Sequence, residues 1–492
     1  MCVLFFALCC VRLQNHPINF ENEEVKLYPQ RKNSNQHIQI SRKIGLFTAI
    51  SIVVANMIGS GIFITSGIIA ANLPDSGWVL LCWLFGGMIS ISGAICYAEL
   101  ATRMPEEGGE YVYLKKLYHP ALGFLSGWTS FFVGFSAPIA SSALSFAEYI
   151  FAGLNMPLSD SNTLQLVFMK KTVAILIILI FTIVHYLGLR LGSKVQNSLT
   201  VLKIIIVLGL ASAGMIYGRG NWSNISFTTT QSFEGIAIGT AMMLVMFSYS
   251  GWNASAYIAG ELKNPRRVLP FSLVTGTLIV MFLYLAVNLF IFQAVPYTEL
   301  KGTIAVVKVA SVGVFGNWMG EVLSLLIGLA LLSSLSAFII LGPRIYFAMA
   351  QDRLFFPFAS KVHPRYGVPG RSIVIQGVIA IMMVLIGSIE QLVIYVIFAL
   401  NIFPWLAIAG LFIARKRHIG DESAVKVWGY PYIPIFFLSS SLILMVIAYF
   451  NRPVESTAAI LTVILGIPFY LLWVKGVNIA KRKLATQAQK LE

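Results

Sequence analysis

The chain has 492 residues, of which 57% are hydrophobic and only 11% are charged, and its mean hydropathy is +0.80. An average soluble domain is about half apolar and about a quarter charged, so this composition excludes a water-soluble globular protein. A net charge of +15 is typical of nucleic-acid binding only where basic residues cluster on a soluble face. The composition instead predicts a helical protein that crosses the membrane several times.

Apolar segments follow one another along the chain after an N-terminal tail over residues 1–44. A helix rises ~1.5 Å per residue, so about 20 apolar residues cross a hydrocarbon core of ~30 Å. Twelve segments reach or approach this length, which predicts twelve transmembrane helices. They are residues 45–70, 78–98, 121–147, 172–189, 195–217, 235–258, 271–295, 322–343, 372–389, 391–414, 431–450 and 456–474.

The basic residues predict the orientation of these segments. If the N-terminus lies inside, 27 of the 35 Lys and Arg residues fall in the inner tails and loops and 6 in the outer loops. Lys203 lies within the fifth segment and Arg344 at the inner end of the eighth, which completes the 35. The positive-inside rule then places the tail 1–44 and the tail 475–492 in the cytoplasm, with the protein in a plasma or bacterial inner membrane. Orientation therefore accounts for the positive charge without a nucleic-acid partner.

Two segments carry small residues near their middle. Gly59, Ser60 and Gly61 interrupt the first segment, and residues 247–253, FSYSGWN, interrupt the sixth. Each glycine costs ~1 kcal/mol relative to alanine inside a helix. Close packing between helices is one explanation for such residues. A break in each helix is the other.

The positions of the two interruptions favour breaks. They fall in segments one and six, so the halves 45–217 and 235–414 run in opposite directions through the membrane. Transporters built from inverted repeats have this arrangement, with two discontinuous helices meeting at the substrate site. We therefore expect an all-α membrane protein with a 5+5 inverted repeat, broken helices 1 and 6, and two further helices over residues 431–474.

The two breaks also indicate the kind of ligand. A half-helix that begins at Ser60–Gly61 presents amide N–H groups and the positive end of its dipole to an anion. Carbonyl groups freed near Phe247, Ser248 and Ser250 would face a cation, and unwound backbone in a membrane must line a polar cavity. A molecule with a carboxylate and an ammonium on one carbon fits both ends. The predicted substrate is an amino acid.

Four motifs carry a resemblance to a known family. They are IGSGIF at 58–63, FSYSGWN at 247–253 followed by ELKNPRRVLP at 261–270, GPRIYFAMAQDRLFFPFASKVHPRYGVP at 342–369, and KVWGYPYIP at 426–434. In this order they resemble the amino acid-polyamine-organocation superfamily, and within it most closely the L-type amino-acid transporters and their bacterial relatives. The resemblance runs from about residue 40 to residue 475.

The resemblance implies roles for residues at the two breaks. The first break would bind the substrate carboxylate, and main-chain oxygens of both breaks would bind the amine. Phe247 would be an aromatic gate and Asn253 a polar link between the broken helices, although core packing and a helix cap are the simpler interpretations. The implied substrate-binding residues are Met57, Ile58, Gly59, Ser60, Gly61, Phe247, Ser248, Ser250 and Asn253.

Lys203 lies about eight residues into the fifth segment, ~12 Å along the helix from its inner end. An ionisable group at this depth is costly and is functional by default, although a lysine stem is long enough to reach the interface. The resemblance implies that its ammonium takes the place of sodium between the first break and segment eight. Ser333, Ser334 and Ser336 are its expected neighbours there.

The substrate is predicted to be neutral, because the sequence places no acidic residue in the middle of any segment. Ser250, where L-type relatives more often have glycine, favours a small side chain. The expected activity is sodium-independent exchange of neutral L-amino acids by alternating access. Proton-coupled symport remains open, because Lys203 is able to release a proton. A cationic amino-acid or polyamine exchanger and a transporter-like nutrient receptor are further alternatives.

The sequence predicts neither an enzyme nor a bound cofactor or metal, because the six histidines are scattered and form no cluster with other ligands. The L-type transporters of animals use a cysteine in the outer loop after segment three to bind a heavy subunit. Residues 154–169 contain no cysteine, so no disulfide-linked heavy subunit is expected. The oligomeric state stays open.

Overall fold

The described part of the chain is almost entirely helical. The computed structural model describes residues 42–154, 163–217, 221–227, 235–303, 306–387, 389–451 and 453–488. Within these ranges it contains no strand, only isolated bridges between Ile44 and Leu262 and between Glu107 and Ile258. Most of the predicted tail 1–44 lies outside the described residues. The prediction of an all-α protein is confirmed.

Helix lengths confirm a membrane protein. Within the described ranges, nine helices are long and apolar enough to cross a membrane, counting Leu46–Asn72 as one. Three shorter apolar helices are Ala237–Tyr249, Val306–Phe315 and Gly370–Ile386. The total of twelve spans and the division into inverted halves stay predictions.

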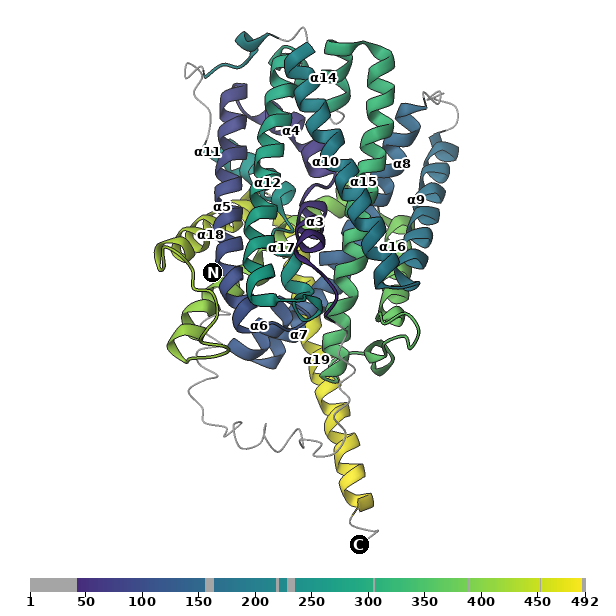
Figure 1. Cartoon of the computed structure of the whole chain (residues 1–492), viewed down its shortest axis with the longest axis vertical. Coiled ribbons are helices and arrows are strands. Elements are labelled where there is room, and N and C mark those ends of the chain that lie inside the picture. The colour runs from purple at the N-terminus through teal and green to yellow at the C-terminus, as the bar shows by residue number, and fades with distance from the viewer. Residues whose placement is uncertain are drawn as a thin grey trace. The chain divides into compact units, whose positions relative to one another are not determined.

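Figure 1 shows the helices in chain order. Their bounds are α3 Leu46–Met57, α4 Gly61–Asn72, α5 Ser76–Arg103, α6 Glu110–Leu117, α7 Pro120–Thr129, the π-helix η1 Ser130–Ser136, α8 Ala137–Gly153, α9 Thr163–Tyr186, α10 Leu189–Tyr217, η3 Trp222–Asn224, α11 Gly235–Tyr249, η4 Ala254–Tyr257, η5 Ala259–Glu261, α12 Pro265–Ala294, α13 Tyr297–Leu300, α14 Val306–Phe315, α15 Asn317–Gln351, η6 Pro357–Ser360, α16 Gly370–Ile386, α17 Ile389–Lys416, α18 Tyr432–Asn451 and α19 Pro453–Ala488.

The third predicted segment is not one continuous α-helix. It consists of α7, the π-helix η1 and α8. In η1 the Ser136 hydroxyl donates to the carbonyl oxygen of Phe131 at 2.6 Å, five residues earlier. Single π-turns inside α-helices are frequent at functional sites. The apolar pattern of residues 121–147 predicted none of this.

The sixth segment also differs from the prediction. The α-helix α11 ends at Tyr249, and the chain continues in the short 3₁₀ helices η4 and η5 instead of a second α-helical half. Gly251 has a φ of +98°, which turns the chain out of the helix. Pro265 then begins α12, six residues before the predicted start of segment seven. Residues 250–264 are therefore irregular backbone in close contact with other elements.

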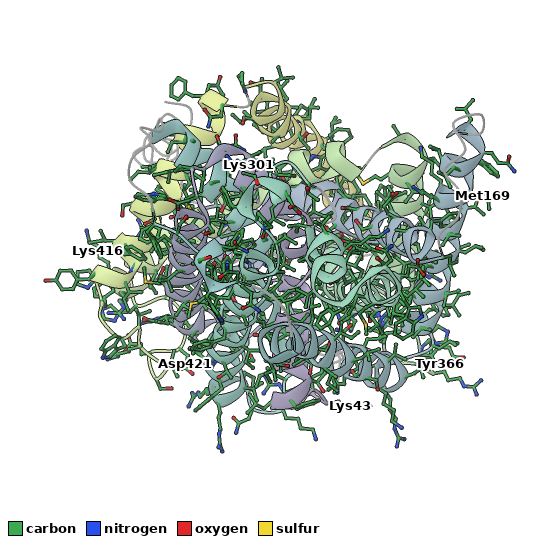
Figure 2. The ribbon with its side chains drawn as sticks, turned by 90° about the horizontal axis from the view of Figure 1, so that it is seen from above. Lys43, Met169, Lys301, Tyr366, Lys416 and Asp421 are labelled. Carbon is green, nitrogen blue, oxygen red and sulfur yellow. The ribbon has the colours of Figure 1, made fainter. Side chains whose placement is uncertain are left out.

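The first broken helix lies among three long helices, because α10, α12 and α15 all pack against α3. α12 also packs against α5, and α15 also packs against α8 and α10. α11 packs against α4. Side chains fill the space between these helices, and the labelled charged residues Lys43, Lys416 and Asp421 lie at the periphery in the end-on view of Figure 2. The break in the first helix is therefore surrounded by protein.

A buried ion pair joins the irregular segment to α15. Arg344, expected at the inner end of segment eight, is only 2% exposed, and Glu261 at the end of η5 is fully buried. The Arg344 Nε donates to Glu261 Oε1 at 2.7 Å, and its Nη2 donates to Oε2 at 3.3 Å. Its Nη1 donates to the Ile340 carbonyl oxygen at 2.7 Å. Both oxygens of the carboxylate are therefore bound by one guanidinium group.

Removal of Glu261 should destabilise the protein strongly. Glu261→Ala leaves the Arg344 charge buried without its partner, which costs about 3–5 kcal/mol for pairs of this kind. Thermal unfolding of the purified protein in detergent measures the loss as a lower Tm. The exposed pair Arg266–Asp421 is the control, because Asp421→Ala should leave the Tm nearly unchanged. Equal effects of the two variants would contradict this role of the buried pair.

Candidate functional site

The first break lies where the sequence predicts it. α3 ends at Met57, α4 begins at Gly61, and the Gly59 amide donates to the Met57 carbonyl oxygen at 2.8 Å in the turn between them. The first amide groups of a helix have no acceptor within the helix. The start of α4 therefore presents N–H groups and a positive dipole end in the interior of the protein.

The two breaks touch each other, and glycines make the contact possible. The Asn56 side-chain nitrogen donates to the Gly251 carbonyl oxygen at 3.3 Å. A Cβ atom at Gly251 would lie 2.2 Å from that nitrogen, and one at Gly61 would lie 2.9 Å from the Ser248 Cα. The hydroxyl groups of Thr65 and Ser248, 3.1 Å apart, add a second link. Asn56 was not among the predicted site residues, because only the folded chain brings it against Gly251.

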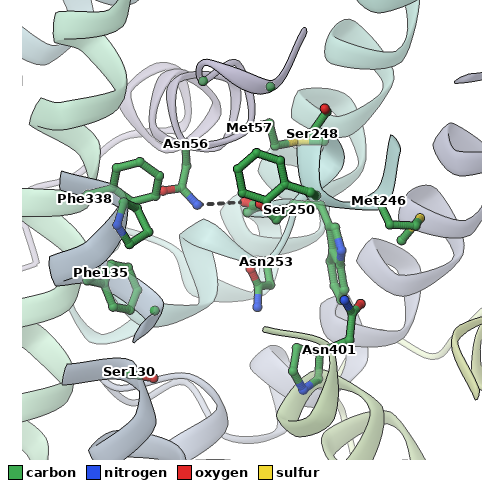
Figure 3. A pocket seen from close by; sticks show the side chains of 18 of the residues that line it. Asn56, Met57, Ser130, Phe135, Met246, Ser248, Ser250, Asn253, Phe338 and Asn401 are labelled. Atoms are coloured by element: carbon green, nitrogen blue, oxygen red, sulfur yellow. Dashed lines mark hydrogen bonds between the residues drawn. The ribbon is translucent and has the colours of Figure 1, made fainter. Parts of the chain in front are cut away.

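A cavity of about 100 Å³ opens between the two breaks (Figure 3). α8, η1 and α17 complete its wall with Phe135, Ser141 and Asn401 among others. Eight of the nine predicted substrate-binding residues line it, namely Met57, Gly59, Ser60, Gly61, Phe247, Ser248, Ser250 and Asn253. Phe247 also packs against the buried apolar cluster of α8 and α15, so its core-packing role and its place on the cavity are compatible.

Ile58 is the predicted residue that does not line the cavity. Its carbonyl oxygen accepts from the Lys203 Nζ at 2.5 Å and from the Ser334 hydroxyl at 2.6 Å. Both donors lie on helices packed against α3, Lys203 on α10 and Ser334 on α15. The unwound peptide at Ile58 is therefore bound by the surrounding helices.

Lys203 is fully buried, so its side chain does not reach an interface with solvent. Its Nζ donates to the carbonyl oxygens of Ile58 at 2.5 Å and Ala55 at 3.3 Å, and to the Ser334 hydroxyl at 2.7 Å. An ammonium group has three N–H donors, and these three oxygens match them.

The three serines of α15 that were expected beside Lys203 have different partners. Ser334 contacts Lys203, whereas the Ser333 hydroxyl lies 3.1 Å from that of Thr200 and the Ser336 hydroxyl lies 2.9 Å from His185 Nε2. Adjacent residues of an α-helix point about 100° apart, so Ser333 and Ser334 face different neighbours.

Glu110 is a site residue that sequence reasoning missed. It begins α6, is 2% exposed and lines the cavity. It accepts from the Tyr97 hydroxyl at 2.8 Å and from the Asn253 side-chain nitrogen at 2.5 Å. Burial raises the pKa of this carboxyl, although hydrogen bonds from Tyr257, Tyr97 and Asn253 act against the rise. It escaped notice because it precedes segment three, outside any apolar run.

Asn253 does not link the broken helices as expected. Its side-chain nitrogen donates to Glu110 and, at 3.2 Å, to the Tyr257 hydroxyl. After the turn at Gly251, the chain forms η4, which packs against α3, α12 and α15. The links between the breaks are made instead by Asn56 and Thr65.

Comparison with known proteins shows the family. A family model described as amino acid permease matches residues 44–469. The serine/threonine exchanger SteT of Bacillus subtilis is 30% identical over 88% of this chain and 96% of its own length. The b(0,+)-type amino acid transporter 1 of Mus musculus is 32% identical over 88% of both chains. The Asc-type amino acid transporter 1 of the same species is 24% identical over 90% of this chain and 83% of its own.

Alanine at Gly251 should disturb the contact between the breaks. Gly251→Ala places a Cβ against Asn56 and also forces a positive φ on a residue with a side chain. Gly302→Ala is the control, because Gly302 has a φ of +76° with no atom near its added Cβ. The control should lose about 1–2 kcal/mol of stability and Gly251→Ala about 1–3 kcal/mol more. Equal Tm values for the two variants would contradict a tight contact between Gly251 and Asn56.

Proposed function

The chain belongs to the amino acid permease family, and on this premise we propose that it is a sodium-independent exchanger of small neutral L-amino acids. The observation that carries the proposal is the cavity between the two breaks, with the positive end of α4 on one side and the carbonyl groups of Met57 and Ser248 near it. A zwitterionic amino acid would place its carboxylate at the positive end of α4 and its ammonium at the two carbonyl groups. The likeness to a serine/threonine exchanger over 96% of that relative supports exchange.

The size and polarity of the cavity support a small substrate. A water molecule needs ~10–15 Å³ of such space, so about 100 Å³ accommodates roughly seven to ten non-hydrogen atoms. Serine has about that number. Asn56 and Thr129 line the cavity, and the Asn56 Oδ1 and the Thr129 hydroxyl are buried without a hydrogen-bond partner among the described residues. A small rotation of either side chain would let a polar substrate group satisfy it.

A neutral side chain fits the charges around the cavity. Glu110 is the one carboxyl group among the lining residues, and its Oε1 already accepts from the Tyr97 hydroxyl and the Asn253 side-chain nitrogen. A cationic side chain would compete with these donors for the carboxyl group, and desolvating a cation without a full partner is costly. Arginine is therefore expected to bind poorly.

Proton symport is the second candidate, and Glu110 favours it more than Lys203 does. Burial raises the pKa of the Glu110 carboxyl, so it takes up a proton at a higher pH than an exposed glutamate. The protonated fraction of Glu110 rises as the pH falls. A symporter that uses this group would therefore accumulate substrate faster when the outer solution is acidified.

Sodium independence rests on Lys203. Its ammonium occupies the space between Ile58, Ala55 and Ser334, where three oxygens converge. We propose that this positive charge replaces a coupling ion and ties the conformation of the first break to α10 and α15.

The remaining features of the proposal rest on the sequence. The excess of basic residues in alternate loops supports cytoplasmic termini, and the breaks in helices one and six support two inverted halves, 45–217 and 235–414. Cys82 and Cys96 are buried, and no cysteine follows residue 96, which supports function without a disulfide-linked subunit.

Uptake into proteoliposomes tests substrate and coupling together. Labelled serine, alanine, leucine and arginine are offered with and without internal serine, sodium and a pH gradient. We expect serine and alanine to exchange fastest, internal serine to stimulate uptake several-fold, and sodium to have no effect. Preferred uptake of arginine would contradict the neutral substrate. Accumulation that is driven by external acid in empty vesicles would replace exchange by proton symport.

Lys203→Ala should abolish uptake in a protein that still folds. The substitution removes the donor to Ile58 and Ala55, so the first break loses its connection to α10. Initial uptake rates, with elution profile and Tm as the check on folding, measure the effect. Lys170→Ala is the control, because Lys170 pairs with Glu148 away from the cavity. Full activity of Lys203→Ala would overturn the coupling role.

A further inference from the structure

A second cavity is an apolar groove between α5, α11 and α18, which pack against one another and lie side by side in Figure 1. Its volume is about 490 Å³, and it shares no lining residue with the substrate cavity. Leu81 and Met88 on α5 and Ile443 on α18 line it and are exposed, whereas Met242 on α11 lines it and is buried. The described residues that line the groove include no charged side chain. The groove therefore opens towards the hydrocarbon of the membrane, with α11 as its floor.

The groove has the depth of one leaflet of the bilayer. Its lining residues on α5 extend from Trp78, near the start of the helix, to Ile89 at its middle, which is ~16 Å along the helix axis. Half of a ~30 Å hydrocarbon core is about as deep. Beyond Ile89 the groove closes, because a Cβ atom at Gly93 would lie 2.7 Å from the Phe437 ring of α18. Tryptophan is enriched at the level of the lipid headgroups, which matches the position of Trp78.

The size and chemistry of the groove select its occupant. A methylene group takes up about as much space as a water molecule, roughly 30 Å³, so about 490 Å³ accommodates about sixteen carbon atoms. This is one acyl chain of a common phospholipid, whereas a sterol with its fused rings is larger. We propose that the groove binds one phospholipid acyl chain, and that the bound chain stabilises α11. On the predicted orientation, the lipid belongs to the outer leaflet.

α11 connects the groove to the substrate cavity. Gly239 and Met242 line the groove, and Met246 and Phe247, about one turn further on, line the cavity. At Gly239 α11 packs closely on α18, since a Cβ atom there would lie 2.4 Å from the Ile447 side chain. An acyl chain in the groove therefore lies against the same half-helix that lines the cavity. Its effect on the substrate rests on the proposed function.

The acyl chain stabilises α11 through van der Waals contacts. The floor of an empty groove has no partner atoms on one side, so its side chains lose dispersion contacts. A bound acyl chain supplies these contacts along the floor at Met242. α11 is followed by irregular backbone at the second break, so its position depends on the elements packed along its sides. The bound chain is one of these elements.

Photolabelling of the wild-type protein identifies the occupant. A phosphatidylcholine with a diazirine on its palmitoyl chain, or a sterol with a diazirine, is added to the protein in detergent, and the labelled residues are mapped by mass spectrometry. We expect the phospholipid to label α11 near Met242, which lines the groove and is otherwise buried. The sterol should label only exposed surfaces. Labelling of α11 by the sterol, or by neither probe, would overturn the proposed occupant.

Two double variants test the effect on α11. Met88→Trp with Ile443→Trp narrows the groove from both walls, and Ile180→Trp with Ile183→Trp adds two indole rings to the exposed face of α9, away from both cavities. Equilibrium binding of labelled serine is measured in detergent with and without dipalmitoyl phosphatidylcholine, with elution profile and Tm as the check on folding. The lipid should strengthen serine binding to wild type and to the α9 variant roughly fivefold or more, as is typical of coupled sites.

The groove variant should respond to the lipid by less than about twofold, because the acyl chain no longer fits beside α11. Equal responses of the two double variants, or no response of the wild type, would overturn the stabilisation of α11. Absence of serine binding in all three proteins would contradict the proposed function instead. Photolabelling of α11 does not depend on serine, so it tests the acyl-chain site separately.

Discussion

The structure depends on one constraint, which is that every polar group of an unwound backbone inside a membrane needs a partner. The first break frees carbonyl oxygens at Ala55, Met57 and Ile58, and each accepts from a neighbouring helix. Lys203 on α10 donates to Ala55 and Ile58, and Tyr284 on α12 reaches Met57. Ser334 on α15 also donates to Ile58, so three helices hold the break, although it occupies only three residues of sequence between Met57 and Gly61.

The peptide groups of the first break differ in whether they contact neighbouring helices or line the cavity. The Ile58 oxygen, bound by Lys203 and Ser334, is filled by the protein and faces away from the cavity. Met57 and Gly61, at the ends of the two half-helices, line the cavity on the other side of the break. On the proposed function, a substrate amine would therefore lie beside Met57, one peptide group away from the oxygen that accepts from Lys203.

The sequence predicted the parts of this site that have a local cause. Gly59 and Gly61 weaken a helix wherever they stand, and Lys203 is conspicuous in any apolar segment. Glu110, the contact of Asn56 with Gly251 and the π-helix at Ser130 have no such local signal, because each depends on what the fold places opposite. Ser333 and Ser334 show the same limit, since adjacent serines look equivalent in sequence and face different neighbours in the helix bundle.

Residues 250–264, after the second break, form short 3₁₀ helices and turns where a second α-helical half was predicted, so most of their polar side chains cannot rely on a regular helix for position. Their side chains find partners outside the segment, Asn253 at Glu110 on α6 and Glu261 at Arg344 on α15. A helix could move as a unit with its hydrogen bonds intact, but this segment has to exchange buried contacts in order to move. Movement of the segment has to break the hydrogen bond between Asn253 and Glu110 and the ion pair between Glu261 and Arg344, and the ion pair costs more to break because it separates two buried opposite charges.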